Sequence, residues 1–227
     1  MTAFRIGYLA FPDITQLDLT GPQQVLARLP GAEQVLVWKT LEPVRSESGL
    51  MLVPDVTFAD CPKLDMICVP GGPGMNALLT DQETLDFLRR MAERARYVTA
   101  VCTGSLVLGA AGLLKGRKAA THWAAMEFLP RFGAIATDQR VVVDGNIITG
   151  GGVTAGIDFG LQVAAELAGD AVAQALQLII EYDPAPPFDS GHPRSADPAV
   201  LGALKERMGP MHTQRAAQVE AAAARLD

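Results

Sequence analysis

The sequence offers little that would bind nucleic acid, a metal ion or a membrane. Its 19 lysines and arginines form no cluster and are outnumbered by 25 aspartates and glutamates, whereas contacts to phosphates need grouped cations. No stretch approaches about 18 uninterrupted apolar residues, so we expect no membrane span. The three histidines include no pair at the i, i+4 spacing of metal ligands, so we predict no metal. Small or neutral molecules are the expected partners.

Cysteine is scarce as well. Cys61, Cys68 and Cys102 are an odd number and lack the spacing of a metal site. The first residues, MTAFRIGYLAF, enter a β-like run directly, without the basic region, apolar region and cleavage site of a secretory leader. Unpaired cysteines are most simply explained by a reducing compartment. We therefore predict a cytoplasmic protein.

The sequence does contain a regular alternation of β-like and helical segments. Hydrophobic residues make up 49% of the chain, which suffices for a buried core. Val- and Ile-rich runs predict strands over residues 4–10, 34–38, 64–69, 97–101 and 146–149, with edge signals over 49–53 and 140–143. Run 64–69 is nearly all apolar, as in a parallel strand covered on both faces. The predicted fold is α/β: a doubly wound, mostly parallel sheet sandwiched by helices, of the flavodoxin-like type.

Stretches with helical spacing separate these runs. The clearest helix starts near Asp81, where Thr80 and Glu83 match a capping box ahead of an apolar stripe. Further helices are expected over residues 20–29, 103–113, 122–131, 154–168 and 170–181.

The composition changes after Tyr182. Residues 183–198 are rich in Pro, Gly, Ser and Asp, which predicts an arm, and residues 199–226 predict a helix interrupted at Gly209-Pro210. We expect one α/β domain over residues 1–182 and a Pro-rich arm with a C-terminal helical extension over residues 183–227. This extension either packs on a second subunit or covers the domain's own surface.

Three glycine-containing turns each follow a predicted strand and precede a helix. They are residues 71–74, residues 102–104 and residues 150–152. In a doubly wound sheet, ligands bind beyond the carboxyl ends of the strands. Three such turns therefore suggest one site where backbone N–H groups converge.

Cys102 lies at the sharpest of these turns, between YVTAV and the helix that begins TGSLVLG. A strand–turn–helix of this kind pushes the side chain outward, as in the nucleophile elbow of hydrolases. A helix N-terminus also favours a thiolate, so we expect a lowered pKa for Cys102 and a reactive sulfur. Cys61 and Cys68 are expected to be ordinary core cysteines.

Asp18 follows the first strand, just ahead of a helix expected to begin near Thr20. It is either a helix cap or a proton carrier. The carboxyl end of the first strand should lie near the three glycine turns. Burial and a neighbouring thiolate would raise the pKa of this carboxyl, so that it holds a proton near neutral pH.

Three motifs together resemble the ThiJ/PfpI superfamily, a branch of the class I glutamine amidotransferase-like fold. They are AVCTG (100–104), GGPG (71–74) and DLTGP (18–22), and the resemblance runs over about residues 4–182. Within that superfamily, Asp18, CTGS and the PAPPF segment (184–188) resemble the isonitrile (isocyanide) hydratases.

The resemblance implies a homodimeric enzyme without a cofactor that adds water to an isonitrile and yields an N-substituted formamide. Cys102 matches the family nucleophile, Asp18 the acid/base carboxylate, and Thr103 a residue that lines the site. Many superfamily members have Glu at the position of Asp18. The hydrolases among them need a histidine, often at the position of Thr103, so a Cys-His hydrolase is disfavoured.

Isonitrile chemistry fits these residues independently of the resemblance. The terminal isonitrile carbon accepts both a nucleophile and a proton, so the Cys102 thiolate would attack it while Asp18 protonates it. Water would then hydrolyse the resulting thioimidate. Backbone N–H groups near Gly72 and at Gly152 and Val153 are candidates for holding the thiolate or the developing charge.

Other functions stay open. CTGSLVLGAAGLL and THW (121–123) also resemble the sensor domain of AraC-type regulators, but residues 183–227 are not basic enough to grip DNA. A stand-alone ligand sensor, or a redox-sensing or carbonyl-repair protein that uses Cys102, remains an alternative. We expect His122 to cap or pack at a helix start, and His192 and His212 to lie at the surface.

Overall fold

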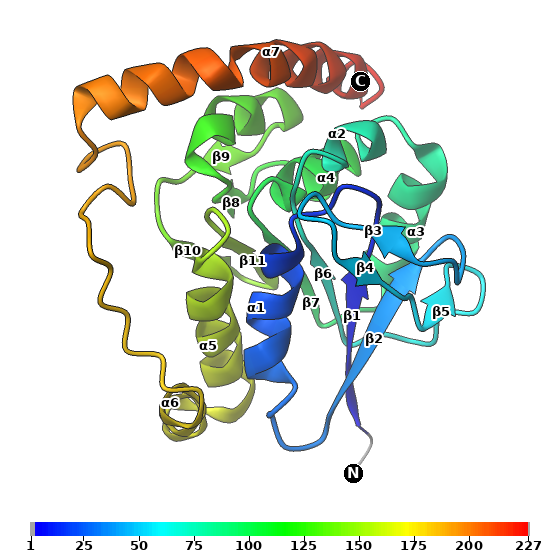
Figure 1. Cartoon of the computed structure of the whole chain (residues 1–227). Helices are drawn as coiled ribbons and strands as arrows, with labels where there is room; N and C mark the ends of the chain where they lie inside the picture. Colours follow the sequence, from blue (N-terminus) through cyan, green and yellow to red (C-terminus); the bar gives the residue numbers. More distant parts are fainter. Residues whose placement is uncertain (1–2, 227) are drawn as a thin grey trace.

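A computed structural model describes residues 3–226 and contains a central sheet of seven strands. Its strand order is β10-β11-β7-β6-β1-β2-β5, and every pairing is parallel except that of β10 with β11. The strands are β1 (Phe4–Leu9), β2 (Ala32–Trp38), β5 (Val56–Thr57), β6 (Met66–Val69), β7 (Tyr97–Val101), β10 (Val141–Asp144) and β11 (Ile147–Gly150). The predicted flavodoxin-like fold is confirmed (Figure 1).

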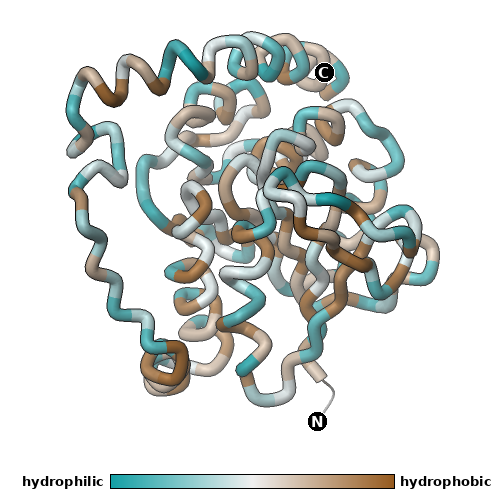
Figure 2. Tube along the Cα trace, viewed as in Figure 1, coloured by the Kyte–Doolittle hydropathy of each residue, from teal (hydrophilic) through white to brown (hydrophobic). Residues whose placement is uncertain are grey.

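Helices cover both faces of this sheet. Helices α1, α5 and α6 pack against one another on one face, and α3, α4 and η1 lie on the other (Figure 1). The helices are α1 (Gln16–Leu26), α2 (Met75–Leu78), α3 (Gln82–Ala92), α4 (Gly104–Ala110), the 3-10 helix η1 (Trp123–Phe132), α5 (Ala155–Ala168), α6 (Asp170–Ile179) and α7 (Pro198–Ala223). The central strands form the hydrophobic core of the molecule (Figure 2). Strand β6 is buried along its whole length.

The two edge signals at 49–53 and 140–143 belong to different sheets. Residues 49–53 contain β4 (Met51–Leu52), which pairs with β3 (Val44–Arg45) outside the main sheet. The signal at 140–143 is β10, which is the antiparallel edge strand of the main sheet rather than part of a separate ribbon. A further ribbon joins β8 (Lys118–Ala119) to β9 (Ile135–Ala136).

One helix start and one helix cap differ from the predictions. Helix α1 begins at Gln16 rather than near Thr20, so Asp18 lies inside its first turn instead of capping it. Helix α3 has Asp81 as its N-cap, and the predicted capping box of Thr80 and Glu83 is wrong. Lys39 forms ion pairs with both Asp81 (2.5 Å) and Glu83 (3.1 Å). The Glu83 carboxylate, which the capping box would have used, is therefore bound to Lys39 instead.

Helix α7 is continuous, and the predicted break at Gly209-Pro210 is wrong. A proline inside a helix leaves one carbonyl without its donor, here that of Glu206. Glu206 is exposed, so water can satisfy that carbonyl. Asp197 caps the start of the helix by accepting from the Ala199 N–H at 2.7 Å.

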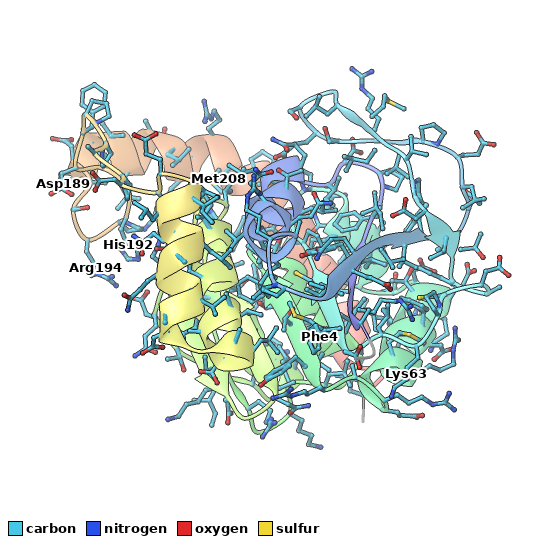
Figure 3. All side chains as sticks on the ribbon, turned by 90° about the horizontal axis from the view of Figure 1, so that it is seen from below. Phe4, Lys63, Asp189, His192, Arg194 and Met208 are labelled. Carbon is cyan, nitrogen blue, oxygen red and sulfur yellow. The ribbon has the colours of Figure 1, made fainter. Side chains whose placement is uncertain are left out.

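The arm and α7 follow different surfaces. Figure 1 shows α7 crossing the end of the molecule toward which β1 points, where it packs on η1, α4 and α2. The buried part of the extension therefore covers the chain's own domain. Most of the arm is exposed, and Figure 3 shows its His192 and Arg194 side by side. Both pair with Asp138 of the domain. None of the helices within residues 3–226 combines the length and the apolarity that a bilayer crossing demands.

Candidate active site

Four loops meet at the carboxyl edge of the sheet because their strands are neighbours. In the order β11-β7-β6-β1, each strand is followed by one segment of the site. Asp18 follows β1, residues 71–74 follow β6, Cys102 follows β7, and residues 151–154 follow β11. The sheet order brings together segments that are up to 136 positions apart in the chain (from 18 to 154).

Cys102 sits on a constrained elbow. Its φ is +57°, in the left-handed region that non-glycine residues rarely adopt. Its N–H donates to the carbonyls of Gly150 (3.1 Å) and Gly151 (2.9 Å), and its carbonyl accepts from Thr121 Oγ1 at 2.8 Å. These bonds hold the strained backbone in place. A side chain at Gly104 would overlap the carbonyl of Val69, so only glycine lets α4 start this close to β6.

Asp18 is completely buried beside Cys102. Its Oδ2 accepts from the Gly71 N–H at 3.0 Å, while Oδ1 has no hydrogen-bond partner among the described residues. Burial raises the pKa of Asp18 to about 7, and hydrogen bonds from Cys102 and Gly71 oppose that shift only in part. The carboxyl can therefore gain or lose a proton near neutral pH. The predicted effect of burial is confirmed, whereas Cys102 lowers the pKa of Asp18 instead of raising it.

The prediction of a lowered pKa for Cys102 is wrong. Burial raises the pKa of this thiol well above its ordinary value, and the charge of Asp18 adds to the rise. The N–H groups of Val153 and Thr103 hydrogen-bond to the sulfur and lower its pKa, but they do not outweigh burial. The sequence indicated a helix N-terminus at this position, but it could not indicate that Cys102 is only 5% exposed.

Cys102 and Asp18 are best treated as one titrating pair, because the two groups are coupled. The pair loses its first proton near pH 7 and keeps the second to far higher pH. Above pH 7 it therefore carries one negative charge and one proton. That proton can lie on the sulfur or on the carboxyl. When the sulfur attacks a substrate, the proton can be transferred to that substrate.

The other predicted residues surround this pair. The backbone N–H groups of Thr103 and Val153 favour the charged form of the sulfur and so lower its pKa. The N–H of Gly72 donates to Thr103 Oγ1 at 3.1 Å, so it holds that side chain and not the thiolate that was predicted for it. Gly152 packs against the His122 ring, where a side chain would collide with it. Val153, at a φ of +28°, is a second strained residue beside the sulfur.

His122 lies next to the site but is not equipped to exchange protons near neutral pH. Its Nδ1 accepts from the Ala124 N–H at 3.2 Å, which is the helix-capping role expected for it. Burial lowers the pKa of His122 to about 4, and the positive charge of Arg215 contributes. The ring is therefore neutral at physiological pH.

A cavity of about 560 Å³ lies between the segment after β11, which includes Val153, and the arm, and neither Cys102 nor Asp18 lines it. The segment from Gly151 to Ala155 forms one wall, and the arm forms another. His192 and Arg194 are among the arm residues that line it (Figure 3).

Arg215 and Asn76 are two buried polar residues that sequence reasoning missed. Arg215 Nε donates to Asn76 Oδ1 at 3.1 Å. The signal for Arg215 was its spacing: it shares the i, i+4, i+7 stripe of α7 with the buried Val219 and Ala222. An arginine within a buried stripe suggests a specific partner. Asn76 had no such signal.

Comparison with known proteins agrees with this geometry. The model of the DJ-1/PfpI family matches residues 5–166. The isonitrile hydratase of Pseudomonas putida is 57% identical over 225 residues, which cover 99% of each chain. The HTH-type transcriptional regulator GbdR of Pseudomonas aeruginosa is 30% identical over 78% of this chain, but only 50% of the regulator is matched.

Solved structures give the same result. A ThiJ/PfpI family protein from Pseudomonas syringae is 46% identical and superposes with a TM-score of 0.94, over 96% of this chain and 91% of that one. Drosophila melanogaster DJ-1beta is 25% identical, with a TM-score of 0.72 over 80% of this chain and 98% of that one. The first similarity extends through the arm and α7, whereas the second is confined to a smaller part of the chain.

Proposed function

We propose that this chain, which belongs to the DJ-1/PfpI family, is an enzyme that adds water to an isonitrile and releases an N-substituted formamide. The observation that carries the proposal is the buried pair of Cys102 and Asp18, which holds one proton and one negative charge above about pH 7. The full-length similarity to an isonitrile hydratase supports the substrate class.

The first chemical step joins the sulfur to the substrate. The terminal carbon of R–N≡C is divalent and accepts a nucleophile and a proton together. As Cys102 Sγ attacks this carbon, the proton of the pair passes through Asp18 to the same carbon. The product is a thioimidate, Cys102–S–CH=N–R, and Asp18 is left as a carboxylate. Its buried Oδ1, which has no other partner among the described residues, is placed to exchange this proton.

The second step returns the enzyme to its starting state. Asp18 takes a proton from water as the water oxygen attacks the thioimidate carbon, and the nitrogen receives that proton. The tetrahedral adduct then collapses: its hydroxyl proton passes to Asp18, the carbon–sulfur bond breaks with its electron pair on the sulfur, and HC(O)–NH–R leaves. The N–H groups of Val153 and Thr103 stabilise negative charge on the departing sulfur. All proton transfers use groups of this chain.

The test follows the loss of an alkyl or cyclohexyl isonitrile and the appearance of its formamide. We expect turnover by the unmodified protein and a loss of about a thousandfold or more in Cys102→Ala and in Asp18→Asn. Cys61→Ala is the matched control, because Cys61 lies outside the site and should be dispensable. Full activity in Cys102→Ala would end the covalent mechanism.

A ligand or redox sensor that uses Cys102 is the competing function, and the similarity to half of a transcriptional regulator favours it. Absence of turnover by the unmodified protein, combined with saturable binding of an isonitrile or another small molecule, would support the sensor.

We further propose that the enzyme is a cytoplasmic homodimer. Cys61, Cys68 and Cys102 are all unpaired, which suits a reducing compartment. Leu178 and Ile179 on α6 are 82% and 66% exposed, and Phe188 of the arm is 79% exposed. Figure 2 shows α6 as a hydrophobic element at the edge of the molecule. A second copy over this face would remove these side chains from water.

A further inference from the structure

Helices η1 and α7 enclose a second cavity, with a volume of about 380 Å³. The two helices pack on each other where α7 crosses the end of the molecule (Figure 1). Every residue that lines the cavity belongs to one of these two helices, so Cys102 and Asp18 are not part of it. The volume lies in the lower part of the range of about 300–1,000 Å³ that is usual for small-molecule sites.

Arg215 is the buried cation in the wall of this cavity. The residue is only 4% exposed, and its Nε donates to Asn76 Oδ1 at 3.1 Å. Within residues 3–226 its side chain makes no other hydrogen bond, so the two Nη groups have no acceptor there. Water in the cavity can accept from them but does not neutralise the charge. A buried cation is costly unless an anion pairs with it.

The described residues supply no such anion. None of their carboxylates forms an ion pair with Arg215. Glu127 lines the cavity, but its carboxylate binds His212 at 2.9 Å. Lys205 of α7 adds a second cation to the lining and has no ion-pair partner among residues 3–226. The cavity therefore has an excess of positive charge.

Apolar side chains form much of the remaining wall. Trp123, Met208 and Met211 are half-buried and line the cavity. Methionine adapts to ligands of different shapes, and a tryptophan ring offers a broad apolar surface. A ligand that fits this lining combines one anionic group with an apolar body.

We propose that this cavity binds a small organic carboxylate. The two carboxylate oxygens accept from the Nη groups of Arg215, and the apolar body lies against Trp123 and the two methionines. Because Asn76 occupies Nε, the two Nη groups form the free fork of the guanidinium, and a carboxylate matches such a fork with two parallel hydrogen bonds. A phosphate dianion fits less well, because Glu127 repels it and Lys205 is the single further lysine or arginine in the lining.

Isothermal titration calorimetry with benzoate, phenylacetate and hexanoate as probes tests the proposal. We expect at least one probe to bind saturably, and its uncharged amide to bind about tenfold or more weakly. Inorganic phosphate at the same concentration should not displace the probe. Absence of binding by all three probes, equal binding of the amide, or displacement by phosphate would each overturn the carboxylate site.

Two variants locate the bound probe. Arg215→Met keeps much of the bulk of the side chain but removes the fork, and should weaken binding by about tenfold or more. Arg131→Met is the matched control, because it removes an arginine from the same η1–α7 contact outside the cavity, and it should leave the dissociation constant unchanged. Cys102→Ala should also bind the probe unchanged. Binding that is lost in Cys102→Ala would place the probe at the catalytic pair and overturn the proposal.

A second pair of variants leaves Arg215 intact. Lys205→Glu reverses a charge in the lining, whereas Arg207→Glu reverses one on the same exposed part of α7 outside the cavity. We expect Lys205→Glu to weaken binding by about threefold or more and Arg207→Glu to have no effect.

Unchanged binding in Arg215→Met overturns the proposal. If that variant does not fold, as judged by circular dichroism, the charge reversals decide, and equal dissociation constants in Lys205→Glu and Arg207→Glu overturn it. None of these measurements uses isonitrile turnover. Failure of this site and failure of the proposed hydratase are therefore distinguishable.

Discussion

Burial governs the chemistry of Asp18 more than any single neighbour. An aspartate in water has a pKa near 3.8, and removal from solvent raises it here to about 7. Below about pH 4 the folded and unfolded chains both hold the proton. Between about pH 4 and pH 7 only the folded chain does, so this group makes the free energy of unfolding fall as pH rises through that window. Above pH 7 the lost stability is not regained.

Asp18→Asn should remove this pH dependence. Relative to the unmodified chain, we expect the free energy of unfolding of the variant to rise by about 3 kcal/mol between about pH 4 and about pH 8. Urea unfolding of both proteins across this range measures the difference. Parallel curves at all pH values would show that the folded state does not perturb Asp18.

At the residue scale, the sequence predicted which residues form the site better than it predicted their protonation states. The turn after YVTAV located Cys102, and the segment after the first strand located Asp18. The direction of the shift at Cys102 was missed, because the local sequence shows a helix N-terminus but not that the fold leaves Cys102 only 5% exposed. Arg215 was missed for a related reason: its partner Asn76 is 139 positions away.

At the scale of elements, the site depends on how closely the loops approach one another. A Cβ on Gly71 would lie 2.5 Å from Thr103 Oγ1 and 2.9 Å from Asp18 Oδ2. Both contacts are shorter than real Cβ atoms tolerate, and both neighbours are held by hydrogen bonds. The glycine therefore permits the loop after β6 to support the carboxyl and the elbow together.

Gly71→Ala should lower stability by about 2 kcal/mol or more and reduce turnover together with it. Gly202→Ala is the matched control, because Gly202 is exposed on α7 and a Cβ at this position would meet no described atom within 4 Å. That change should stabilise the protein by roughly 0.5–1 kcal/mol without altering turnover. Thermal unfolding and the formamide assay measure both. A Gly71→Ala protein as stable and active as the original would contradict the described packing of the loop.

Element types were predictable, whereas their ends followed tertiary contacts. Alternating periodicity identified the parallel strands and the main helices. The start of α3 near Asp81 was predicted, but its capping box was wrong because Lys39, at the end of β2, engages Asp81 and Glu83. The continuity of α7 was missed because a proline predicts a break unless the freed carbonyl faces water.

At the scale of the whole molecule, sheet order turns distant motifs into one site. From the sequence, a doubly wound sheet could be predicted, and ligands of such sheets bind at the carboxyl edge. The sequence did not reveal which strands are neighbours in the sheet. The order β11-β7-β6-β1 supplies that information. Helix α7 packs on η1, α4 and α2 and brings Arg215 into hydrogen-bond contact with Asn76.

The proposed homodimer is also a whole-molecule property. We expect sedimentation to give twice the chain mass of 24.0 kDa. Leu178→Glu should weaken the dimer, since the side chain is exposed in the single chain, whereas Val200→Glu on α7 should not. A monomeric unmodified protein would reject the dimer, and an unaffected Leu178→Glu dimer would place its interface elsewhere.

The most direct test of the account is to trap the covalent intermediate. The protein is mixed with an isonitrile, quenched in acid during turnover, digested and examined by mass spectrometry. The account predicts that the peptide containing Cys102 gains the full mass of the isonitrile, and that peptides containing Cys61 or Cys68 do not. Sustained formamide production with no adduct on Cys102, and with undiminished turnover in Cys102→Ala, would contradict it.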